Sequence, residues 1–173
     1  MSSTASVIEI PSFSLIVMIG SAGAGKSTFV RNRFGATEIV SSDFLRGVVR
    51  DDETNMEASA DAFEILRLIV DKRLAARRLT VVDATNVRAR DRAPLVAIAR
   101  RHGAPVVAIV LDVDGPTCVA RNDARADRPN SIIYVMRQQD ALRASLGGLP
   151  NEGYAAVHVL DAAGSVDAEI RRV

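Results

Sequence analysis

The segment Leu15-Ile16-Val17-Met18-Ile19-Gly20-Ser21-Ala22-Gly23-Ala24-Gly25-Lys26-Ser27-Thr28 decides the fold. Its first five residues are an apolar run typical of a buried strand, and residues 20–27 fit the template G-x-x-x-x-G-K-[ST]. In such a P-loop, glycines allow a tight turn, and backbone N–H groups and the positive end of the next helix point at one phosphate chain. The alternative, a flexible turn with a solvated lysine, is disfavoured because the strand, loop and helix patterns occur together.

The P-loop template assigns roles to individual residues. Lys26 is expected to reach the β- and γ-phosphates of a nucleotide, and the Ser27 hydroxyl to ligate Mg²⁺. The predicted nucleotide-binding residues are those of the loop and the first helical turn: Gly20, Ser21, Ala22, Gly23, Ala24, Gly25, Lys26, Ser27 and Thr28.

The composition is that of one ordinary globular domain, residues 1–173, with 48% hydrophobic and 25% charged residues. A net charge of +1 argues against a broad duplex-coating surface, and 4% aromatic residues provide no stacking platform for single strands. The lone Cys118 and the isolated His102 and His158 indicate neither a disulfide nor a transition-metal site. With no signal peptide and no apolar run of roughly 18 residues, we expect a soluble, cytoplasmic protein without membrane contact.

Short β-branched runs alternate with longer amphipathic stretches, which is typical of a parallel sheet covered by helices on both faces. We predict strands at residues 13–19, 38–41, 79–83, 106–111 and 156–160. Helices are predicted from Lys26, after Asp43, and over residues 56–77, 88–102, 116–125, 131–146 and 165–172. Ligands of such sheets bind beyond the carboxyl ends of the strands, where Gly20, Asp43 and Asp83 collect.

Asp43 lies in Ser41-Ser42-Asp43-Phe44-Leu45-Arg46, which follows the second predicted strand. A phosphoryl acceptor hydroxyl needs a carboxylate that orients it and takes its proton, and Asp43 is placed to do so. Ser42 or Asp43 could instead cap the following helix, but the P-loop in the same chain favours catalysis. Arg46, one turn later, is expected to hold an acceptor phosphate by a forked contact, or to form an exposed pair with Asp43.

The third predicted strand ends in Thr80-Val81-Val82-Asp83-Ala84-Thr85-Asn86. An apolar run ending in Asp is the Walker B arrangement, in which the carboxylate holds Mg²⁺ directly or through water. Asp at a strand end also commonly starts a turn. We assign Asp83 to the metal or to the acceptor, with Thr85 and Asn86 as weaker candidates.

Arg121, Arg125 and Arg128 form a third cluster. On one continuous helix they would lie within about 60° of one another. Like charges on one face repel unless an anion meets them, and arginines that close over a triphosphate neutralise charge on the transferred group. The alternatives are a solvated helix end, or a helix that breaks before Arg128 because of Pro129. The functional interpretation is favoured.

Together these segments resemble the kinase domain of bacterial polynucleotide kinase-phosphatase, the RNA end-healing enzyme. The resemblance covers nearly the whole chain. It includes the P-loop, Ser41-Ser42-Asp43-Phe44 with Arg46-Gly47 and Asp51-Asp52-Glu53, Leu79-Thr80-Val81-Val82-Asp83-Ala84-Thr85-Asn86-Val87, and the three spaced arginines.

The resemblance implies an α/β P-loop kinase fold. It implies a mostly parallel five-stranded sheet in the order 2-3-1-4-5, with a helical arginine-bearing lid at about residues 116–135. It also implies transfer of the γ-phosphate of ATP or another NTP to a 5′-OH RNA or DNA end, with Mg²⁺ or Mn²⁺. Asp43 matches the general base and Arg46 an arginine at the acceptor end. Lys26 and Ser27 match the phosphate and metal ligands, and Arg121, Arg125 and Arg128 match the lid over the donor phosphates.

The chain departs from that family in one respect. The family proteins join this kinase to metallophosphatase and adenylyltransferase domains, for which the chain has no Gly-Asn-His-Glu or Lys-x-Asp-Gly segment. It is expected to be either an excised domain or a stand-alone kinase. Two other interpretations stay open: a P-loop kinase of a small metabolite or nucleotide sugar, and an ATP-binding regulatory module that transfers no phosphate.

Overall fold

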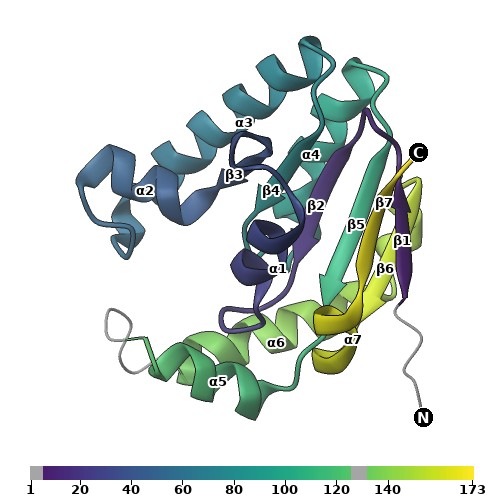
Figure 1. Cartoon of the computed structure of the whole chain (residues 1–173). Coiled ribbons are helices and arrows are strands. Elements are labelled where there is room, and N and C mark those ends of the chain that lie inside the picture. Colours follow the sequence, from purple (N-terminus) through teal and green to yellow (C-terminus); the bar gives the residue numbers. More distant parts are fainter. Residues whose placement is uncertain (1–5, 126–131) are drawn as a thin grey trace.

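A five-stranded parallel sheet forms the centre of the molecule. The structure, a computed structural model, describes residues 6–125 and 132–173. The strands are β2 (Leu15–Ile19), β3 (Ile39–Ser41), β4 (Thr80–Asp83), β5 (Val106–Leu111) and β6 (Ala156–Leu160). They lie in the order β3-β4-β2-β5-β6 (Figure 1), which confirms the predicted α/β class and the order 2-3-1-4-5 of these five strands.

Helices cover both faces of this sheet. They are α1 (Lys26–Arg33), α2 (Ser42–Arg50), α3 (Ser59–Ala75), α4 (Ala89–Arg101), α5 (Gly115–Asp123), α6 (Ile132–Leu146) and α7 (Ala162–Asp167), with short 3-10 turns at Ala36–Glu38, Met56–Ala58 and Leu149–Asn151. Among the residues described, no helix has the length and apolarity that a membrane span requires.

The central strand β2 shows why two cores form. Its residues are all buried, and successive side chains point to opposite faces. Leu15, Val17 and Ile19 pack into the cluster that α3 and α4 cover, whereas Ile16 and Met18 pack with α1. A strand buried on both faces needs an unbroken apolar run, which is what the sequence provides.

The prediction of a helix over residues 165–172 was wrong. Helix α7 ends at Asp167, and β7 (Glu169–Arg172) pairs in parallel with β1 (Val7–Ile10), which was not predicted (Figure 1). The local signal for β1 is the alternation of buried Ile8 and Ile10 with exposed neighbours. A strand of four residues gains stability only from a partner, and that partner lies at the other end of the chain.

Candidate active site

The P-loop connects β2 to α1 and has the strained backbone that its glycines permit. Gly23 and Gly25 have φ angles of 81° and 97°, in the left-handed region. The Gly20 N–H donates to the Thr85 carbonyl at 2.9 Å, which joins the P-loop to the loop after β4. Helix α1 begins at Lys26, so its N-terminus points to the space enclosed by the loop.

Gly23 also lies against helix α5. A Cβ atom at this position would stand 2.1 Å from the Cys118 carbonyl oxygen, well inside any tolerated contact. Glycine is therefore required at position 23 both for its backbone conformation and for the close approach of the P-loop to α5.

Substitution Gly23→Ala tests this packing, with Gly103→Ala as the matched control. Gly103 also has a positive φ, 62°, but nothing lies within 4 Å of its added Cβ. We expect Gly103→Ala to lower the free energy of unfolding by about 1 kcal/mol from backbone strain, and Gly23→Ala by about 2–4 kcal/mol because a clash adds to the strain. Urea-induced unfolding measures both. Equal losses would show that the loop yields without disturbing α5.

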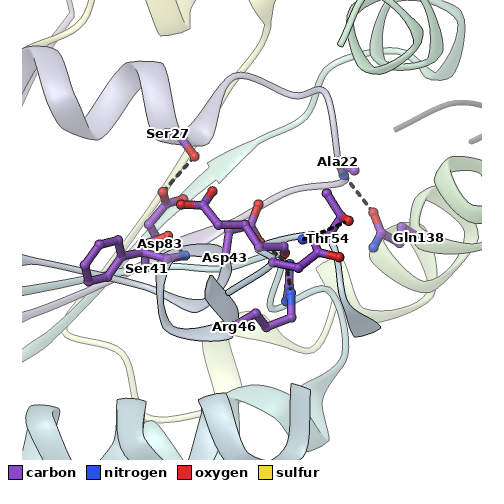
Figure 2. A network of polar contacts seen from close by, with 11 residues as sticks. Ala22, Ser27, Ser41, Asp43, Arg46, Thr54, Asp83 and Gln138 are labelled. Atoms are coloured by element: carbon purple, nitrogen blue, oxygen red, sulfur yellow. Dashed lines mark hydrogen bonds and ion pairs between the residues drawn. The ribbon is translucent and has the colours of Figure 1, made fainter. Parts of the chain in front are cut away.

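Ser27 and Asp83 form a hydroxyl–carboxylate pair beneath the P-loop. The Ser27 Oγ donates to Asp83 Oδ2 at 2.7 Å (Figure 2), because β4 lies next to β2 and both end at the same edge of the sheet. Asp83 is 6% exposed. The two oxygen ligands fit Mg²⁺, which usually takes one or two protein ligands and completes its shell with phosphate oxygens and waters.

The Lys26 side chain contacts the backbone of the P-loop. Its Nζ donates to the Ser21 carbonyl at 2.9 Å. Burial lowers the pKa of the Lys26 ammonium below its usual value, against the opposing attraction of the Asp83 and Asp43 carboxylates. A buried cation of this kind favours an incoming anion, since a phosphate would compensate its lost hydration.

Asp43 lies in the first turn of α2, and Figure 2 shows its carboxylate turned, like that of Asp83, toward Ser27. The cap of α2 is Ser41, whose side chain accepts from the Phe44 N–H at 3.3 Å, so the alternative that Ser42 or Asp43 caps this helix was wrong. Because Ser41 caps the helix, the Asp43 carboxylate lines the pocket, where it pairs with Arg46.

Arg46 forms the ion pair with Asp43 that the i,i+3 spacing allowed, but the pair is not exposed. The arginine is 6% exposed, and its Nε also donates to the Glu53 carbonyl at 2.8 Å. These contacts hold both charged groups in fixed positions on the wall of the pocket.

The lid arginines are only partly brought together. Helix α5 ends at Asp123, two residues before the predicted end at residue 125, so it carries Arg121 but not Arg125. Arg121 donates from α5 to the Ala24 carbonyl at 3.5 Å, beside the P-loop. Arg125 follows the helix and lines the main pocket, and Arg128 lies outside the described residues.

Two glutamines on α6 contact the P-loop and were not predicted. The Ala22 N–H donates to Gln138 Oε1 at 2.7 Å (Figure 2), and Gln139 Nε2 donates to Ser21 Oγ at 2.7 Å. The sequence does contain a signal for them. Both residues lie between Val135 and Leu142 on the buried stripe of a predicted helix, where polar side chains need partners.

The main pocket, of about 600 Å³, contains these groups. The P-loop, Asp43 and Asp83 line it. Its other walls are the face of α3 that carries Phe63 and Arg67, the start of α4 with Arg88 and Arg90, and part of α6. Ser59 and Asn86 also line it, and the buried Ser59 Oγ and Asn86 Oδ1 have no hydrogen-bond partner in the described part of the chain.

A second cavity, of about 910 Å³, also borders the P-loop. It is bordered by Gly25 and Thr28, by Arg121, and by residues of α7 and β7. Arg33 lines it as well, and its guanidinium donates to the carbonyls of Ser165, Val166 and Ala168 at 2.8–3.0 Å. Gly25 and Thr28 line both cavities, so both border the P-loop.

Comparisons with known proteins agree with this architecture. A family model described as AAA domain matches residues 15–149. A chain of the Pnkp1/Rnl/Hen1 RNA repair complex is similar in structure, with a TM-score of 0.70 and 21% identity, over 80% of this chain and 47% of that chain. The present chain thus spans about half the length of that protein.

Other solved structures match over most of both chains. A putative kinase from Chloroflexus aurantiacus has a TM-score of 0.61 and 15% identity, covering 87% of this chain and 88% of that one. A gluconokinase from Sinorhizobium meliloti has a TM-score of 0.54 and 17% identity, covering 89% and 85%. No curated protein sequence gives a significant match. At these identities the likeness shows the fold, which is that of the P-loop kinases.

Proposed function

The chain belongs to the AAA domain family, and on that premise we propose that it is a polynucleotide 5′-hydroxyl kinase. It transfers the γ-phosphate of ATP or another NTP to a 5′-OH RNA or DNA end, in nucleic-acid repair. The observation that carries this proposal is that Arg67, Arg88 and Arg90 line the main pocket together with the P-loop. The proposal covers the kinase step alone, since the chain has no phosphatase or adenylyltransferase motif.

The donor side is supported by the P-loop and its neighbours. The loop amides and Lys26 would hold the phosphates, and Ser27 with Asp83 would hold Mg²⁺ or Mn²⁺. Such an ion, when bound, neutralises charge on the β- and γ-phosphates. The second cavity begins at Gly25 and Thr28 and provides the space for the nucleoside.

The acceptor side is strongly cationic for a chain of net charge +1. Arg67, Arg88 and Arg90 line the main pocket from α3 and from the start of α4. Within residues 6–125 and 132–173, the side chains of Arg67 and Arg88 make no ion pair or hydrogen bond. Arginines without partners suit the phosphodiesters of a nucleic-acid strand, whereas a neutral sugar would leave them uncompensated.

The reaction is an in-line transfer. The 5′-oxygen forms a bond to the γ-phosphorus while the bond to the β–γ bridging oxygen breaks, and the hydroxyl proton passes to Asp43. Lys26, Arg121 and Arg125 offset the charge that develops on the transferred group, and Arg128 is proposed to join them. Holding the donor on the P-loop and the acceptor hydroxyl on Asp43 supplies the alignment.

The proposed function is tested by offering γ-labelled ATP and Mg²⁺ with a 5′-OH oligonucleotide, its 5′-phosphorylated twin, and a panel of metabolites that includes gluconate and shikimate. Label is expected on the 5′-OH oligonucleotide alone. Label only on a metabolite would identify a small-molecule kinase. Binding of ATP without transfer to any acceptor would identify a regulatory module, and either outcome contradicts the proposal.

Substitution Arg67→Gln tests the proposed acceptor contact of Arg67. We expect the KM for the oligonucleotide to rise about tenfold with little change in kcat, because one charge-assisted phosphate contact is lost. The slope of log(kcat/KM) against log salt concentration should become shallower by about 0.7, the contribution of one phosphate contact on a single strand. Arg143→Gln is the control, since Arg143 is exposed on α6 outside the pocket. An unchanged salt slope in Arg67→Gln would show that Arg67 does not contact a phosphate of the oligonucleotide.

A further inference from the structure

We propose that Gln138, on α6, donates a hydrogen bond from its side-chain amide to the γ-phosphate of the donor nucleotide, and so distinguishes a triphosphate from a diphosphate. The inference rests on the proposed function only in requiring that a nucleoside triphosphate binds the P-loop. It does not depend on the identity of the acceptor.

The orientation of the Gln138 amide is fixed by its partner. The Ala22 backbone N–H can only donate, so the side-chain atom at 2.7 Å from it must be the oxygen. The Nε2 group therefore carries two N–H donors, and in the described part of the chain it has no acceptor. Gln138 is 6% exposed and lines the main pocket. Leaving N–H donors of so buried a side chain without an acceptor costs free energy. A ligand in the main pocket can supply that acceptor.

The position of Gln138 favours the γ-phosphate over the β-phosphate. It contacts the Ser21–Ala22 peptide unit, and Lys26 Nζ binds the carbonyl of the same unit at 2.9 Å. The amides nearer the start of α1 cradle the inner phosphates in such loops, and the lysine reaches outward to the γ-phosphate. In Figure 2 the Gln138 amide points from α6 toward the part of the site that holds Asp43. The group transferred to a hydroxyl on Asp43 must pass through that space.

The neighbouring Gln139 provides a contrast. Its Nε2 donates to Ser21 Oγ at 2.7 Å and to the Val113 carbonyl at 2.9 Å, so both of its N–H donors are used within the protein. Gln139 fastens α6 beside the loop. Gln138 uses only its oxygen for that purpose and keeps its donors for a ligand.

The test compares two nucleotides and three variants by isothermal titration calorimetry at pH 8 with Mg²⁺. The probes are ADP and β,γ-methylene-ATP, which is not hydrolysed. Gln138→Glu keeps an oxygen for the Ala22 N–H but has no N–H donor, and Gln138→Met removes both. We expect Gln138→Glu to bind ADP within about twofold of the unmodified protein and the ATP analogue at least about tenfold more weakly. Gln138→Met should also lose preference for the analogue, and Gln139→Met should lose thermal stability while keeping the ratio of the two affinities.

The outcomes separate a ligand contact from a structural role. The Gln138→Glu carboxylate also adds a negative charge, which opposes a triphosphate more than a diphosphate, so the uncharged Gln138→Met decides the question. If Gln138 only fastened α6 to the loop, Gln138→Met would weaken the binding of both nucleotides alike and keep the ratio of their affinities, and that result would overturn the inference. Failure of the unmodified protein to bind either nucleotide would instead overturn the proposed function and this inference with it. Normal nucleotide binding without transfer to an oligonucleotide would leave the Gln138 result valid. It would refute only the proposal that the acceptor is a 5′-OH nucleic-acid end.

Discussion

Replacing Asp43 by asparagine is expected to lower kcat for phosphoryl transfer by about 10²–10⁴-fold, the range for loss of a positioned general base. The amide can still accept a hydrogen bond from Arg46, so the buried arginine keeps a partner and α2 keeps its place. It cannot take the proton of the attacking hydroxyl. Because Asp43 lies on α2 and not in the P-loop, the Kd for ATP should change by no more than about twofold.

The asparagine variant is preferable to Asp43→Ala for this purpose. Alanine would leave the buried Arg46 guanidinium without its carboxylate, and the resulting loss of stability would obscure the catalytic effect. Single-turnover kinetics and ATP titration measure the two quantities separately. Asp61→Asn, an exposed change on α3 outside the pocket, is the matched control. Near-normal turnover in Asp43→Asn would exclude Asp43 as the base.

The parts of the site that the sequence predicts are those that depend on the order of strands and on local motifs. The P-loop is one continuous segment, and Asp83 follows a strand that pairs directly with β2. Once these two strands are neighbours, their ends meet at one edge, and the contact between Ser27 and Asp83 follows from that. The position of Asp43 near the same edge has the same origin, since β3 pairs with β4.

The parts of the site and the fold that the sequence did not predict depend on how the helices pack on the sheet. Local sequence patterns do not specify this packing. Gln138 is 116 residues from Ala22, and only the packing of α6 against the loop brings them together. Arg67 lines the pocket because α3 turns that face toward it. The pairing of β1 with β7 joins Val7 to Glu169, across nearly the whole chain. In each case the local sequence allows several partners, and long-range packing selects one of them.

Substitution Lys26→Met is expected to remove phosphoryl transfer, by on the order of 10²–10³-fold or more, because the group that neutralises charge on the transferred phosphate is lost. The same change should raise the melting temperature of the ligand-free protein. Burial disfavours the charged form of Lys26 in the fold, as the lowered pKa indicates, and methionine fills similar space without a charge. The residue is therefore retained at a cost to stability, as is common for functional groups.

The pH dependence of stability distinguishes this explanation from a simple gain in packing. The folded-state pKa of Lys26 lies below the ordinary value of 10.5, so between the two values the unfolded chain binds more protons. The free energy of unfolding of the unmodified protein should then receive a contribution that rises with pH through this interval, and Lys26→Met should lack it. Its stability advantage should thus be greatest near neutral pH and shrink toward pH 10.5. Lys72→Met, which removes the chain's other lysine from an exposed site on α3, should change neither activity nor this pH profile. Thermal unfolding between neutral and alkaline pH measures the effect. A lowered melting temperature of Lys26→Met at neutral pH would contradict this explanation. It would show that the attraction of the Asp83 and Asp43 carboxylates outweighs the cost of burying the Lys26 ammonium.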